Sequence, residues 1–297
     1  MRIREMDIEF YRNFSDIMEN KCEPGWQYDE MKFCGVKFSS AKRARAYDKS
    51  HQRFRDFERE SEEIIALLGL DADHTVLDMG CGTGAFAIHA AKHLKKIYAV
   101  DVSKAMLRRA RRKAKKANLD NIEFYHGGFL TYEHKAEPVD AIVSSRVLHH
   151  LPDFWKLIGL KRLAQMLKTN GRLYLHDVVF SFDITNYESS IKGFIESMTE
   201  KLGLQSREVL KIHFRQEYST CGWIMQGLLE RAGFMIDKAD YKDDFKAAYL
   251  CTKKSESMLN EDLKNISVKG QHWQQLLKRL RDKRRNVKYY ESQRNGH

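Results

Sequence analysis

Apolar and polar positions follow two alternating patterns through the middle of the chain. Short apolar runs of strand length, Thr75–Met79 and Ile97–Val102, alternate with amphipathic stretches of helix length, Ala85–His93 and Ala105–Ala117. Because parallel strands are joined by long crossovers that are usually helices, this alternation predicts a doubly wound α/β sheet. Further strands are expected at Ile122–Tyr125, Ala141–Ser144, Arg172–Asp177, Met235–Ala239 and Ala247–Cys251, and further helices at Leu157–Leu167 and Trp223–Ala232.

The predicted fold is Rossmann-like, with seven strands that are mostly parallel and an antiparallel last strand. Residues 1–46 are interpreted as an N-terminal extension, 47–253 as the domain and 254–297 as a basic C-terminal tail. Within the domain, residues 182–218 break the strand–helix rhythm, and we interpret them as a helical insertion after the fifth strand. Helices are also expected in both terminal extensions.

Positive charge is concentrated in two places. The chain has 297 residues, of which 42% are hydrophobic and 31% charged, as in an ordinary globular protein. The formal net charge of +11 lies mainly in Lys104–Lys116 and beyond Lys253. In the tail, Trp273 and Leu280 belong to an apolar stripe at helical spacing opposite a basic face. Docking of this helix on its own domain or on a second subunit is the favoured interpretation, and contact with phosphates, anionic lipid or a partner groove is the alternative.

The first residues, the length of the apolar runs and the cysteines together suggest a cytoplasmic protein. The first residues contain no apolar segment like that of a secretory signal, and no run approaches the roughly 20 apolar residues of a transmembrane helix. The five cysteines are scattered and form no C-x-x-C pair. They are expected to be reduced thiols, and no metal site is predicted.

The most informative motif is the glycine-rich turn after the first predicted strand. In Val76–Gly84 the form D-x-G-x-G-x-G ends where a helix begins, and the next strand ends in Asp101. Glycines allow the backbone to approach a ligand closely, and a helix start offers free amides to a negative group. A carboxylate at the end of the second strand suits ribose hydroxyls. The loop alone fits a nicotinamide enzyme as well as a methyltransferase.

Further motifs distinguish the two. Val143–Asp153 reads VSSRVLHHLPD after the fourth predicted strand, and Leu167–Leu173 reads LKTNGRL before the fifth. Together with the glycine motif, these segments resemble the class I S-adenosylmethionine-dependent methyltransferases, especially the branch with ubiquinone and menaquinone biosynthesis enzymes. The resemblance covers roughly Tyr47–Lys253 and implies S-adenosylmethionine as the cofactor.

This resemblance also implies roles for individual residues. Gly80, Gly82 and Gly84 would line the methionine part of the cofactor, and Asp78 would lie near its amino group. Asp101 would bind the ribose hydroxyls. Further cofactor contacts are expected from Tyr47, Cys81, Val102, Met106, Gly128, Phe129, Ser145 and Arg146.

One position departs from the family pattern. Many relatives carry an aspartate after the third strand that accepts the adenine amino group, whereas this chain has Gly127-Gly128-Phe129. The adenine end of the site therefore lacks its expected carboxylate. A cofactor-binding protein without transfer activity is an alternative for this reason.

The acceptor is expected to be a small molecule, with oxygen as a candidate atom. Some natural-product sugar O-methyltransferases share the Leu-His-His-x-Pro-Asp segment, and by that resemblance His149 would be the base and Asp177 its partner. The insertion, with His213, Glu217 and Tyr218, is expected to cover the acceptor pocket. An RNA acceptor recruited through the basic helix and tail is the alternative.

Overall fold

The structure is a computed structural model that describes residues 25–32, 34–35, 40, 44–45, 56–255 and 257–258. Tyr47 and the apolar stripe of the tail lie outside the described residues, as do the boundaries expected near residue 46 and most of residues 254–297. Within the described part, no helix combines the length and the apolar composition needed to cross a membrane.

The core of the structure is one sheet whose main path runs in the order β3-β2-β1-β4-β5-β8-β7. Strands β1 to β5 pair in parallel, whereas β8 is antiparallel to both of its neighbours. The predicted mostly parallel sheet with an antiparallel last strand is confirmed, and the short β6 pairs with β5 off this path. The strands are β1 Thr75–Met79, β2 Lys96–Asp101, β3 Ile122–His126, β4 Val139–Ser145, β5 Leu167–Phe180, β6 Thr220–Cys221, β7 Phe234–Asp243 and β8 Lys246–Lys253.

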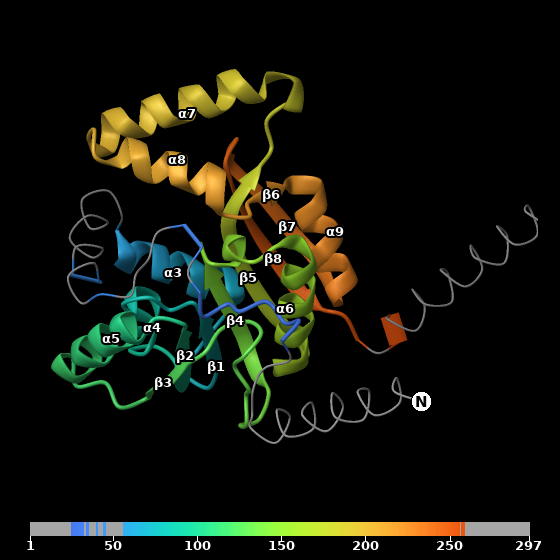
Figure 1. Cartoon of the computed structure of the whole chain (residues 1–297). Helices are drawn as coiled ribbons and strands as arrows, with labels where there is room; N and C mark the ends of the chain where they lie inside the picture. The colour runs from blue at the N-terminus through green and yellow to red at the C-terminus, as the bar shows by residue number, and fades with distance from the viewer. Residues whose placement is uncertain are drawn as a thin grey trace, which may run out of the picture.

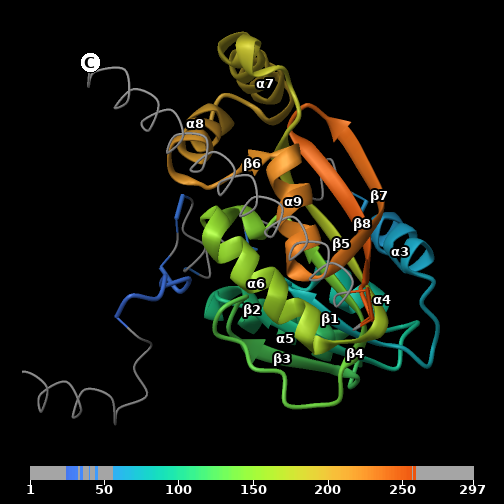
Figure 2. The ribbon, with the colours of Figure 1, turned by 90° about the vertical axis from the view of Figure 1, so that its right-hand side faces the viewer.

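Helices cover both faces of the sheet, as Figures 1 and 2 show. One face carries α3 Phe57–Leu68, α4 Ala85–Ala90 and α5 Lys104–Lys116, and the other carries α6 Asp153–Met166 and α9 Gly222–Ala232. Since side chains alternate along a strand, β1 supplies both faces: Val76 joins one buried cluster, and Leu77 and Met79 join the other. Burial on both sides explains why the strands read as continuous apolar runs.

Strand β5 is longer than the sequence pattern indicates. Asn170-Gly171, a turn-type pair just before the expected strand Arg172–Asp177, lies inside it, where Asn170 adopts φ of 60°. Pairing with β4 shifts register there, between Val139 opposite Leu167 and Ala141 opposite Arg172. Asparagine tolerates the left-handed backbone conformation, so the irregularity is a bulge within the strand instead of a strand end.

The segment after β5 forms two helices, α7 Tyr187–Leu202 and α8 Ser206–Gln216, which pack on each other beyond the end of β5 (Figures 1 and 2). Aromatic side chains join this pair to the sheet. The rings of Phe194 and Phe245 stack with centroids 4.1 Å apart, and those of Phe180 and Phe214 stack at 5.9 Å. After α8 the chain returns to the sheet through residues 217–219.

A buried lysine holds this returning segment. The Lys156 side chain in α6 is fully buried, and its ammonium group donates to Asp153 Oδ1 at 2.7 Å and to the carbonyl oxygen of Tyr218. Tyr218 N in turn donates to the carbonyl oxygen of His149 at 2.8 Å. Lys156 therefore fixes the path of the chain beside His149.

We expect Lys156→Met to lower the free energy of unfolding by about 2 to 3 kcal/mol, because it removes two charge-assisted hydrogen bonds from a buried site. Lys211→Met is the control, since Lys211 forms an i,i+3 pair with Glu208 on an exposed helix face and is expected to cost less than about 1 kcal/mol. Urea unfolding of both variants measures the difference. Equal losses would contradict the anchoring role of Lys156.

Candidate active site

The glycine loop turns tightly against the end of β2. Gly80, Gly82 and Gly84 all have positive φ, between 56° and 81°. The amides of Gly80 and Cys81 donate to the carbonyl oxygen of Val100 at 2.8 and 2.9 Å. A Cβ on Gly80 would lie 2.3 Å from Val147 Cγ2, so only glycine fits between the loop and the segment after β4.

Asp101 joins this loop to the start of α5. Its Oδ2 accepts from Gly82 N at 2.8 Å, and its Oδ1 accepts from Ser103 N at 2.7 Å. Ser103 caps α5 by accepting from Met106 N. Burial raises the pKa of the Asp101 carboxyl, although the two amide hydrogen bonds oppose this shift. The carboxylate thus lies at the end of β2 with both flanking loops fixed around it.

Asp78 carries a buried carboxylate next to the glycine loop. Its side chain is 4% exposed, and within the described part of the chain its Oδ2 has no hydrogen-bond partner. Burial, reinforced by the charge of Asp101, raises the pKa of Asp78 to about 7. Because an unpaired buried carboxylate is costly, a cationic group at this oxygen would be stabilising. The residues present therefore fit the ammonium end of an amino-acid cofactor.

A cavity runs from the glycine loop along the ends of the strands. The predicted residues on its wall are Gly80, Gly82, Asp101, Val102, Met106, Gly128, Phe129, Ser145 and Arg146. Three others lie off the wall: Asp78 is buried next to the loop, Cys81 belongs to the core, and Gly84 lets α4 approach α5. A Cβ on Gly84 would lie 3.1 Å from that of Ala110.

The wall also contains residues that the sequence did not indicate, from the N-terminal segment of residues 25–35. Glu30 is the most informative of them. Its Oε1 accepts from Leu130 N, Thr131 N and Thr131 Oγ at 2.7 to 2.9 Å. Its Oε2 would lie 2.5 Å from a Cβ on Gly128, so the glycine makes room for this carboxylate. Burial raises the pKa of Glu30 despite these hydrogen bonds.

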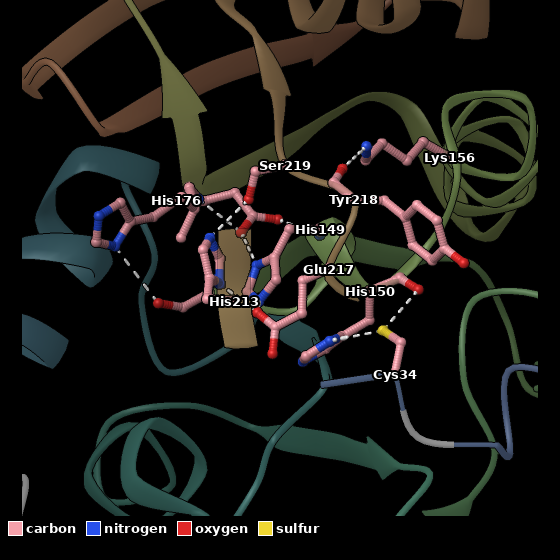
Figure 3. Close-up of polar contacts among 12 residues, drawn as sticks. Cys34, His149, His150, Lys156, His176, His213, Glu217, Tyr218 and Ser219 are labelled. Atoms are coloured by element: carbon pink, nitrogen blue, oxygen red, sulfur yellow. Dashed lines mark hydrogen bonds and ion pairs between the residues drawn. The ribbon is translucent and has the colours of Figure 1, made fainter. Parts of the chain in front are cut away.

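The structure brings His149 and Asp177 together, as the resemblance implies. His149 Nδ1 lies 2.5 Å from Asp177 Oδ1, and His149 N donates to Asp177 Oδ2 at 3.0 Å. Figure 3 shows that the other ring nitrogen of His149 faces Glu217, whose Oε2 is 3.4 Å away. Burial lowers the pKa of His149, but the carboxylates of Asp177 and Glu217 together raise it to about 9.

Glu217 and His150 complete a polar cluster around His149. Glu217 accepts from His213 Nδ1, and the other ring nitrogen of His213 contacts Ser219 Oγ at 3.0 Å (Figure 3). The hydrogen bonds from both histidines hold the pKa of Glu217 well below its usual value against the effect of burial. Burial and the nearby His149 lower the pKa of His150 to about 4.

His150, and not His149, lies on the cavity wall. Its Nδ1 is 3.3 Å from the Sγ of Cys34, which also lines the cavity. His149 is 6% exposed and lies behind this wall. Because Glu30 and Cys34 belong to the same segment, this segment contacts the cavity at both the Gly128 end and the His150 end.

Comparison with known proteins identifies the chemistry of this site. The sequence model of the family described as "Methyltransferase domain" matches residues 76–171, which include the glycine loop, Asp101 and His149. The chain is a class I S-adenosylmethionine-dependent methyltransferase. The resemblance to this class is confirmed, and S-adenosylmethionine is its cofactor. The ubiquinone-like branch stays a prediction.

Several relatives resemble this methyltransferase over much of its length. An uncharacterised methyltransferase of Geobacillus sp. (strain WCH70) is 26% identical over 201 residues, which is 65% of this chain and 86% of the relative. The 27-O-demethylrifamycin SV methyltransferase of Amycolatopsis mediterranei is 24% identical over 203 residues, which is 62% of this chain and 74% of the relative. A S-adenosylmethionine-dependent methyltransferase from Aquifex aeolicus shares the fold at a TM-score of 0.52 and 20% identity, with 73% of this chain and 100% of that one covered.

The raised pKa of Asp78 predicts that cofactor binding depends on pH. Below pH 7 the carboxyl is protonated in the free methyltransferase and must lose its proton to pair with the cofactor ammonium group. We therefore expect the affinity for S-adenosylmethionine to fall about tenfold per pH unit below pH 7, with proton release on binding. Calorimetry at several pH values in two buffers of different ionisation enthalpy measures both effects.

Asp78→Asn is the matched control for this pH dependence. It should bind the cofactor more weakly at pH 7.5 to 8, and its affinity should vary little below pH 7, because the titrating group is gone. A pH-independent affinity in the unsubstituted chain would contradict the assignment of Asp78.

Proposed function

We propose that this methyltransferase transfers a methyl group to the hydroxyl oxygen of a small molecule, bound at the His150 end of the cavity. The observation that carries the proposal is the continuity of one cavity from Gly82 and Asp101 to His150, with the segment that bears Glu30 and Cys34 on its wall. An acceptor inside this cavity has to be small enough to fit between the segment and the sheet. The relative from Amycolatopsis, which is named for O-methylation of a small molecule, supports the same class.

The sulfonium of S-adenosylmethionine supplies the methyl group when the cofactor is bound. The chain's own contribution is to position the reactants and to handle the charge of the acceptor. His149 is oriented by Asp177 through two hydrogen bonds, and Glu217 lies on its opposite side. We assign His149 as the base for the acceptor hydroxyl and Asp177 as its positioning residue. In this role His149 Nε2 exchanges Glu217 for the acceptor, and His150 gives way on the cavity wall.

Residues of the predicted insertion also reach this end of the site. Glu217 and His213 contact the His149 cluster, and the Tyr218 ring meets Tyr28 of the N-terminal segment edge-on, with centroids 6.2 Å apart. These contacts support a role of residues 182–218 as a cover of the acceptor pocket. We therefore propose a methyltransferase domain over residues 47–253, in which residues 182–218 form an insertion that covers the acceptor pocket.

A transfer assay tests the acceptor class. Tritium-labelled S-adenosylmethionine is incubated with a panel of hydroxylated small molecules and, in a separate arm, with bulk RNA. We expect transfer to a hydroxylated compound and none to RNA. His149→Ala and Asp177→Asn should each lower kcat roughly 100-fold or more without changing cofactor affinity. The control His93→Ala lies on an exposed turn and should keep full activity. Transfer to RNA alone would overturn the proposal.

We further propose that Glu30 accepts the adenine amino group in place of the aspartate missing after β3. Three donors hold one of its carboxylate oxygens, and the other lies over Gly128 on the cavity wall. Met106 and Phe129 line the same part of the cavity. A carboxylate fixed in this way favours a ring that carries an amino donor over one that carries a carbonyl oxygen.

Two product analogues test this assignment. S-adenosylhomocysteine has an amino group on the purine ring where S-inosylhomocysteine has a carbonyl oxygen. We expect the chain to prefer the adenosyl compound by about tenfold or more, and Glu30→Gln to lose most of the preference, because an amide also donates. The matched control is Glu133→Gln, an exposed glutamate in the same loop region. An undiminished preference in Glu30→Gln would rule Glu30 out.

A further inference from the structure

The polar cluster beside the acceptor end has the composition of a metal site. His149, His150 and Glu217 each present one ligand atom, and these three atoms lie within 4.8 Å of one another. We propose that His149, His150 and Glu217 bind a divalent transition metal such as Zn²⁺, with an open coordination position toward the cavity. Two imidazoles and one carboxylate are a ligand set found in catalytic zinc sites. The inference goes beyond the proposed function: with Nε2 bound to the ion, His149 would act on the acceptor hydroxyl through the ion and not as a free base.

The separation of the two best-placed ligand atoms supports an ion between them. His149 Nε2 and Glu217 Oε2 are 3.4 Å apart, which is long for a charge-assisted hydrogen bond. Ligands about 2.0 to 2.2 Å from a tetrahedral zinc ion are separated from one another by roughly 3.3 to 3.5 Å. The pair therefore has the spacing of two neighbouring ligands, and the ligand atom of His150 lies within 4.8 Å of the ligand atoms of both other residues.

Outer partners already hold two of the ligands in orientation. Asp177 binds Nδ1 of His149, which leaves Nε2 as the ligating atom, and its Oδ1 is also held by Val178 N at 2.7 Å. His213 holds the Glu217 carboxylate and is itself bound by Ser219. Carboxylate–histidine–metal arrangements of this kind fix the tautomer of a ligand and strengthen its binding.

The charges of the cluster suit a divalent cation. An ion bound to Nε2 would displace the proton that His149 otherwise carries, and the carboxylates of Asp177 and Glu217 would then balance its charge of +2. Both carboxylates are shielded from solvent, with side-chain exposures of 0% for Asp177 and 6% for Glu217. A dication between them removes the cost of two buried negative charges in a small volume.

His150 directs the open side of the site toward the cofactor. It lies on the cavity wall with Val147 and Gly80, whereas His149 lies behind it. A metal held by three protein ligands keeps one position for an exogenous oxygen or sulfur donor. In this arrangement that position faces the place where the acceptor is proposed to bind.

Metal content of the full chain tests the inference without cofactor or acceptor. After chelator treatment and refilling with Zn²⁺, Fe²⁺ or Co²⁺ alone, elemental analysis should find about one equivalent of at least one of these ions. Co²⁺ should give the intense visible bands of a tetrahedral site. Glu217→Gln and His150→Ala should lose the bound ion, and Asp177→Asn should bind it roughly 10- to 100-fold more weakly. The control His93→Ala also removes one histidine, as His150→Ala does, but it should bind the ion normally.

Two results would overturn the metal site. One is the absence of stoichiometric uptake of all three ions by the unsubstituted chain. The other is equal uptake by the Glu217→Gln and His150→Ala variants, each shown to be folded by circular dichroism and by binding of S-adenosylhomocysteine. Since these readouts require no methyl transfer, a wrong acceptor assignment would leave the metal result unchanged, and cofactor binding without metal uptake would separate the two failures.

Discussion

The Asp101 carboxylate is the contact on which the cofactor site depends. One oxygen holds the amide of Gly82 and the other holds that of Ser103, so a single side chain fixes the glycine loop and the start of α5 together. Val100 adds the carbonyl oxygen that receives the amides of Gly80 and Cys81. The end of β2 therefore fixes the positions of both loops. Because the parallel pairing of β1 and β2 sets where that end lies, the sheet itself determines the geometry of the site.

The polar cluster around His149 is built differently, from segments that are distant in sequence. His149 and His150 follow β4, Asp177 is part of β5, and Glu217 follows α8. Lys156 joins two of these segments by binding the carbonyl oxygen of Tyr218 from inside α6 (Figure 3). This region therefore depends on tertiary contacts throughout, whereas the glycine-loop end combines a local turn with long-range contacts such as that of Glu30 with Thr131. The division matches the general rule that a fold fixes where a site lies and that loops fix its chemistry.

The sequence reveals the residues whose roles depend on local spacing. Gly80, Gly82 and Asp101 follow strands that periodicity identifies, so their positions at the strand ends could be predicted. Glu30 could not be found in this way, because it meets Thr131 across 101 residues and no local pattern marks it. The pairing of Glu217 with His149 depends on the path of α8, which composition does not determine. The sequence predicts too short a β5, because Asn170-Gly171 is typical of a turn. In the structure the pairing with β4 continues on both sides of this pair, which forms a bulge.

The N-terminal segment contacts both ends of the cavity. Glu30 contacts the loop after β3 and Cys34 contacts His150, although only three residues separate them in the chain. Four residue steps span at most about 14 Å when extended, so the two contacts are tethered within that distance. A displacement of Glu30 from the loop after β3 beyond this reach would also draw Cys34 away from His150. Under the proposed function, exchange of spent cofactor would then be coupled to departure of the methylated product.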